Sequence, residues 1–134
     1  MLIAQEIAQP VYDVLYSEGV KAYVLSDYES AKEKFSNAYA VAPGNTKIRN
    51  MYVNTLIKLG ENSVNSGQDD EALSLFLQAD EISNNPEVKA ALAEMIAVIS
   101  PEEALRRQET NQVIAEVREN QNQPTGSQNS DQTT

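Results

Sequence analysis

The sequence contains no cysteine and no histidine. Without cysteine, disulfides, thiolate metal ligands and thiol nucleophiles are excluded. Without histidine, the chain lacks the usual general base at neutral pH and the commonest metal ligand. Enzymatic chemistry would have to use Asp, Glu, Lys or Tyr alone. We therefore expect a protein that is not an enzyme and that needs no metal or other cofactor.

Tryptophan is also absent, and the aromatic residues are two phenylalanines and six tyrosines. Hydrophobic residues make up 41% of the chain, so its core has to be mainly aliphatic. A length of 134 residues is enough for one domain with a modest core.

Basic residues are scarce, with 10 Lys and Arg against 20 Asp and Glu. An acidic chain repels phosphate groups, which argues against nucleic acid and against anionic membrane surfaces as partners. Charges or amides interrupt every apolar run before it reaches the roughly 18 residues of a membrane span. The first seven residues are mostly apolar, but no basic region precedes them and Glu6 lies among them. We expect a cytoplasmic protein that does not insert into a membrane. An extracytoplasmic domain of a membrane-anchored protein is the alternative if this chain is a piece of a longer one.

The spacing of apolar residues is helical throughout, and no segment alternates as a strand would. Pro10 suits the first turn of a helix, and Ser26 with Glu29 forms a candidate capping box for the next one. The cluster Pro43-Gly44-Asn45 separates that second helix from a longer one, from about Thr46 to Val64. The sequence therefore predicts at least three helices in its first half.

Further start signals follow in the second half of the chain. Residues 65–68 are expected to form a turn. Asn85 is expected to cap the next helix, with Pro86 as its first residue. Residues 100–103 have the pattern of a further helix start. Residues 121–134 contain no large apolar side chain. A segment of that composition cannot bury enough surface to offset its ordering entropy, so we expect a disordered tail. The prediction is an all-α chain of about six helices.

Five residues of the first half recur in the second half at the same mutual spacing, and each pair of counterparts is 41 positions apart. Small residues are expected where helices cross, and the aromatic residue is expected to fill the gap between them. The two sets are Leu15, Gly19, Ala31, Phe35, Ala38 and Leu56, Gly60, Ala72, Phe76, Ala79.

This pattern resembles the tetratricopeptide repeat (TPR), which combines a Leu-Gly step, an Ala-x-x-x-Phe step and a terminal Pro. The first copy also has Pro43 at the terminal position, and residues 27–31 are close to the family's turn between helices. The displacement of 41 exceeds the usual period of about 34. We interpret the excess of seven as an extension of the helix from about residue 46, because seven residues rotate a helix face by only about 20°.

The resemblance implies a right-handed superhelix of antiparallel helix pairs, an α-solenoid. Repeat 1 would span about residues 12–45, repeat 2 about 46–86, and a degenerate capping pair about 86–119. Residues 1–120 would then form one helical domain, followed by the tail at 121–134.

The resemblance also implies a protein–protein interaction module, because the first helices of TPR pairs line a concave groove. The expected groove residues come from both repeats: Tyr16, Val20, Tyr23, Asn54, Ile57, Lys58 and Glu61. A peptide or a segment of a partner protein would bind there. Asn54 and Lys58 could also hold a C-terminal carboxylate, as in TPR proteins that grip chaperone tails.

Alternatives remain open. Tyr16 and Tyr23 could be packing residues rather than groove residues. The chain could also be a structural or self-associating spacer of a larger assembly, which would make it a homo-oligomer. The acidic run 69–71 is expected to be first-turn charge at a helix start, not a metal site.

Overall fold

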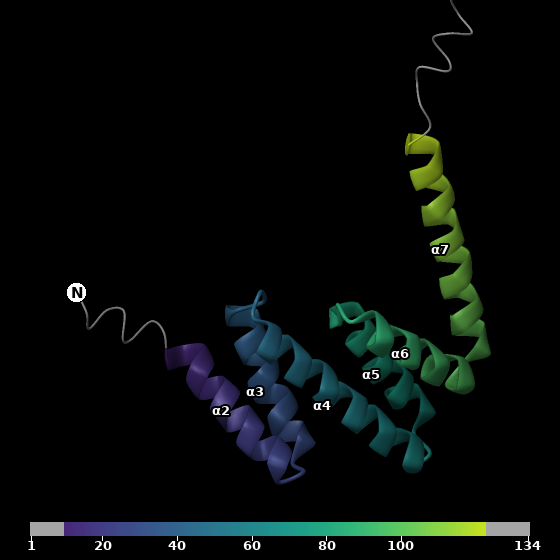
Figure 1. The fold of residues 1–134 in the computed structure, drawn as a ribbon. Helices are drawn as coiled ribbons and strands as arrows, with labels where there is room; N and C mark the ends of the chain where they lie inside the picture. Colours follow the sequence, from purple (N-terminus) through teal and green to yellow (C-terminus); the bar gives the residue numbers. More distant parts are fainter. Residues whose placement is uncertain (1–9, 123–134) are drawn as a thin grey trace, which may run out of the picture. The chain divides into compact units, whose positions relative to one another are not determined.

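The computed structural model describes residues 10–122, and helices occupy nearly all of this range (Figure 1). No strand occurs between Pro10 and Asn122, so the predicted all-α class is confirmed. The helices are α2 (Pro10–Val24), α3 (Tyr28–Val41), α4 (Thr46–Asn65), α5 (Asp69–Ile82), α6 (Pro86–Ile99) and α7 (Pro101–Asn122). The predicted disordered tail starts inside α7 and otherwise lies outside the described residues.

The chain divides into two compact units, one ending at Ser100 and one beginning at Pro101. Helices α2 to α6 form the described part of the first unit, and α7 that of the second. This boundary falls inside the predicted capping pair of residues 86–119, whose pairing stays a prediction. Within residues 10–122, no helix is both long enough and apolar enough to cross a membrane.

Helix starts follow local side-chain chemistry at the two asparagines before α4 and α6. The Asn45 side chain accepts a hydrogen bond from the Ile48 amide at 3.1 Å. The Asn85 side chain accepts from the Glu87 amide at 2.9 Å, and Pro86 occupies the first helical turn. Such caps satisfy backbone donors that have no partner inside the helix. The predicted starts at both positions are confirmed.

The predicted capping role of Ser26 is wrong. Ser26 has a φ of 62° and closes the preceding helix instead. Its amide donates to the Tyr23 carbonyl at 2.9 Å, and the Asp27 amide donates to the Ala22 carbonyl at 2.9 Å. This pattern is a Schellman motif, in which a left-handed residue ends a helix. Asp27 then caps α3, because its side chain accepts from the Ser30 amide at 3.2 Å.

The turn between α4 and α5 repeats this geometry 41 residues later. Gly67 has a φ of 75°, and its amide donates to the Val64 carbonyl at 3.0 Å. The Gln68 amide donates to the Ser63 carbonyl at 2.8 Å. Gln68 occupies the cap position of α5 but makes no side-chain capping bond. The two helix pairs therefore turn in the same way with different residues.

The predicted crossing of small residues against phenylalanine is present in both pairs. A methyl group added at Gly19 would lie 2.6 Å from Phe35 Cε1, and one added at Gly60 would overlap the Phe76 ring in the same way. Both phenylalanines are fully buried. Glycine is needed at these two positions because the aromatic ring occupies the space of a Cβ atom. The four alanines of the repeat are also fully buried: Ala31, Ala38, Ala72 and Ala79.

Helix α4 is one continuous helix of 20 residues, compared with 15 in α2, so the predicted extension is confirmed. Its first turns pack on α3: Ile48 is buried, and the rings of Tyr39 and Tyr52 lie 5.7 Å apart. The core continues from α4 and α5 to α6, where Leu92 and Ile96 are fully buried. Each helix from α2 to α6 packs against the next one along the chain. The right-handed superhelix stays a prediction.

Candidate functional site

A groove lies between α4 and α6 in the first unit. The Cα atoms of these two helices stay more than 8 Å apart, although each helix packs against α5. The space between them is a groove of about 530 Å³, within the range of clefts that bind ligands. Its lining residues are Tyr28, Lys58, Glu61, Asn62, Val64, Asn65, Phe76, Met95, Val98 and Ile99.

One wall of the groove is apolar and accessible to solvent. This wall belongs to α6: Val98 is 84% exposed, and Met95 and Ile99 are half-buried against the core. Val64, which is 41% exposed, adds an apolar side chain from α4. Single exposed apolar residues are common on proteins. Two exposed valines and two half-buried apolar side chains around one hollow form a patch of the kind that marks a binding surface.

The other wall carries polar groups. Lys58 Nζ lies 4.0 Å from Glu61 Oε1, and both side chains are about half exposed. A surface pair of this kind contributes about 0–1 kcal/mol to stability, so a partner can rearrange it at little cost. Asn62 and Asn65 add two amide side chains to the same wall.

The predicted groove residues are divided among several surfaces. Lys58 and Glu61 line the α4–α6 groove. Tyr16 lines a different hollow of about 330 Å³, beside Asp13 and the first turn of α4. The others line neither of these two hollows: Val20, Tyr23, Asn54 and Ile57.

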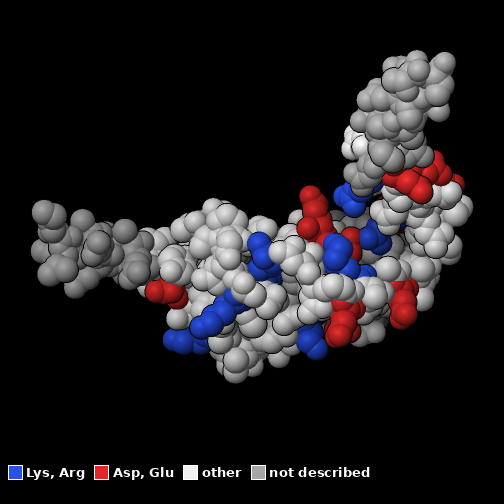
Figure 2. Space-filling model, turned by 45° about the horizontal axis from the view of Figure 1, so that its top comes forward, with Lys and Arg blue, Asp and Glu red and all other residues white. Residues whose placement is uncertain are grey.

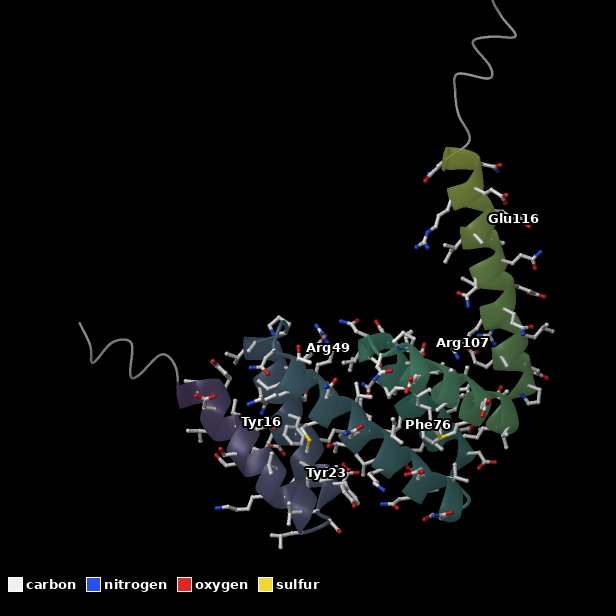
Figure 3. The ribbon with its side chains drawn as sticks, viewed as in Figure 1. Tyr16, Tyr23, Arg49, Phe76, Arg107 and Glu116 are labelled. Carbon is white, nitrogen blue, oxygen red and sulfur yellow. The ribbon has the colours of Figure 1, made fainter. Side chains whose placement is uncertain are left out.

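Tyr16 and Tyr23 of α2, both labelled in Figure 3, are half-buried and contact other rings. The Tyr16 ring centroid lies 5.9 Å from that of Phe35. The Tyr23 ring meets Tyr28 edge to face at 5.2 Å. Both side chains therefore contribute to packing and keep part of their surface in solvent. Because Tyr28 lines the groove, Tyr23 contacts a groove residue without lining the groove itself.

Residues 54, 57 and 58 lie on α4, as predicted, with different exposure. Asn54 and Lys58 are exposed, whereas Ile57 is half-buried against the core. Lys58 already has Glu61 as a partner. The carboxylate clamp at Asn54 and Lys58 stays a prediction.

Sequence reasoning missed the contribution of α6. The apolar residues Val88, Leu92, Met95, Ile96 and Ile99 have helical spacing in the sequence, and Leu92 and Ile96 form the buried centre of this stripe. Val98 lies off that stripe, and an apolar residue off the buried face is the signal that could have identified the site. Tyr28 was missed because its role depends on the neighbouring helices.

A second hollow of similar size, about 510 Å³, is polar and involves α3 and α5. Glu29, Lys32, Asn37 and Gln78 are among its lining residues. On the face drawn in Figure 2, basic and acidic side chains lie intermixed. Between residues 10 and 122, no three acidic side chains are grouped as metal ligands would be.

Comparison of the chain with protein-family models, with curated proteins and with solved structures found no match.

Proposed function

We propose that this chain is a protein–protein interaction module, a TPR-like stack of helix pairs that binds a segment of a partner protein. The binding surface is the face formed by the first helices α2, α4 and α6. The observation that carries the proposal is the α4–α6 groove with its exposed valines, Val64 and Val98. Burial of apolar surface stabilises a complex by about 25 cal/mol per Å² before the costs of association.

The lining of this groove has the mixture that peptide sites use. Apolar side chains of α6 supply contact area, and Tyr28 adds a rigid aromatic ring with a hydroxyl group. Amides and one exposed ion pair on α4 can orient a bound backbone. A partner that extends along the same face towards α2 would reach Tyr16 and Val20.

The test is affinity capture followed by titration of the captured partner. Val98→Asp should weaken binding at least tenfold, because it places a charge in the apolar wall without touching the buried core. Val41→Asp is the matched control, since Val41 is also an exposed valine but lies at the end of α3. Tyr16→Ala with Ile57→Ala tests the extension towards α2. If the Val98 variant stays helical and captures the same partner with unchanged affinity, the groove is not the binding surface.

A structural role is the second candidate, and α7 is the observation that favours it. This helix exposes Val113, Ile114 and Val117, which lie within about 100° of arc on one face. A self-associating helix would bury such a stripe. Sedimentation equilibrium of the full chain should then show a mass that rises with concentration, and Ile114→Asp should abolish the rise.

A further inference from the structure

The charge of the first unit is unevenly divided. Residues 10–65 contain six acidic and six basic residues, whereas residues 66–100 contain seven acidic residues and one basic residue. That one cation, Lys89, is already engaged. Its ammonium group donates to the main-chain oxygen of Asp80 and lies 3.4 Å from the Asp80 carboxylate. Helices α5 and α6 therefore present a strongly negative surface.

One end of the apolar groove lies in this negative region. Asn65 and Ile99, the last residues of α4 and α6, both line the groove. The first turn of α5 begins four residues after Asn65 and consists of Asp69, Asp70 and Glu71. Since α5 follows α4 through a short turn and packs against α6, this acidic turn lies close to the same end of the groove.

Helix dipoles add to the negative potential at this end. The C-terminus of an α-helix carries roughly half a negative charge, which basic residues in the last turn usually offset. The last turns of α4 and α6 contain no basic residue. The N-terminus of α5 carries about half a positive charge, which offsets only part of the negative charge of the three carboxylates. A cation from outside the chain would therefore be stabilised there.

We infer that the partner segment is cationic: it carries apolar side chains that fill the α4–α6 groove and Lys or Arg residues that face the acidic end at residues 69–71. This inference rests on the proposed function. An anionic segment would find one lysine in the groove, Lys58, which is already paired with Glu61. The apolar wall supplies binding area, and the acidic end fixes the direction and the charge of the segment.

A displayed library of random dodecapeptides, selected against the full 134-residue chain, tests the inference. A parallel selection against the Val98→Asp variant identifies peptides that bind outside the groove, and these are discarded. Peptides sensitive to Val98→Asp should be enriched in apolar residues and in Lys or Arg, and their affinity should fall as salt is raised.

A triple variant then locates the cation. Asp69→Asn, Asp70→Asn and Glu71→Gln together should weaken the selected peptides about tenfold, because the charges facing their basic residues are removed. The matched control is Glu33→Gln, Glu81→Gln and Glu87→Gln, which removes the same number of charges from exposed carboxylates that line neither the groove nor the hollow at Tyr16. Circular dichroism melts show whether each variant is folded at the assay temperature.

The outcomes separate the inference from the proposed function. Peptides that need Val98 but are neutral or acidic, or that bind the two triple variants equally well, overturn the inference and leave the groove as a binding site. Failure to select any peptide sensitive to Val98→Asp overturns the proposed function itself. Self-association that Val98→Asp abolishes would make a second copy of the chain the occupant, and it would also overturn the inference.

Discussion

Helix pairs α2–α3 and α4–α5 are nearly the same inside and different outside. Each pair crosses with a glycine against a phenylalanine, and each turns through a residue of positive φ with the same two backbone hydrogen bonds. At partly exposed positions beside the crossing, corresponding residues differ: Tyr16 in α2 corresponds to Ile57 in α4, and Val20 corresponds to Glu61. Packing restricts the residue types at the crossing, because an added methyl group would overlap the phenylalanine ring. Positions that face solvent accept different side chains, because no neighbouring atom fills the space around them.

The largest expected effect tests whether the two crossings are equivalent. Phe35→Ala and Phe76→Ala should each lower the free energy of unfolding by about 3–5 kcal/mol, the usual cost of emptying a buried aromatic site. Urea denaturation monitored by circular dichroism measures both losses. A loss of less than about 1 kcal/mol in either variant would show that its pair does not depend on the ring.

The glycines give the next largest effect. Gly19→Ala and Gly60→Ala should each destabilise the fold by about 1–3 kcal/mol, because the new Cβ overlaps a phenylalanine ring. The sign is informative, since alanine would otherwise stabilise a helix interior by about 1 kcal/mol.

A matched control uses the other partner of the crossing. Phe35→Leu should recover part of the loss in the Gly19→Ala background, because it vacates the overlapped space. Stabilisation by Gly19→Ala alone would contradict the close crossing.

Substitutions in the two turns should change the stability less, and the change should have opposite signs in the two helix pairs. Ser26 adopts a left-handed conformation that costs a non-glycine residue about 1–2 kcal/mol. Ser26→Gly should therefore raise the thermal midpoint by a few degrees, whereas Gly67→Ala should lower it. Differential scanning calorimetry compares the two. If both substitutions act in the same direction, the turns are not equivalent.

The caps should give the smallest effect. Asp27 caps α3 through the Ser30 amide, whereas its counterpart Gln68 makes no side-chain cap. Asp27→Ala should cost about 1 kcal/mol, and Gln68→Ser should add a few tenths of a kcal/mol or more by supplying the missing acceptor. Chemical denaturation of both variants is the measurement, and no change in the Asp27 variant would contradict its capping role.

Sequence patterns predicted the helices and both crossings because these features depend on local spacing. The prediction failed at Ser26, where a serine followed three residues later by Glu29 has the pattern of a capping box. Its actual role depends on whether the preceding helix ends in a left-handed residue. Two hydrogen bonds back to α2 show that it does, and the residue types around it do not specify this.

The candidate site was predicted in part, for a related reason. Lys58 and Glu61 were expected because they lie on the same face of one helix. Val98 was not expected, because it lines a groove only where α6 lies opposite α4, and α4 ends more than 30 residues earlier in the chain.

The sequence by itself determined the all-helical class, the repeated crossing and the acidic balance, since periodicity, glycine spacing and charge are properties of the chain. Only the tertiary structure decided where a surface stays open. Helices α4 and α6 both pack against α5 without closing on each other. The groove, its exposed valines and its acidic end arise from that separation, which is set by side-chain packing between distant segments.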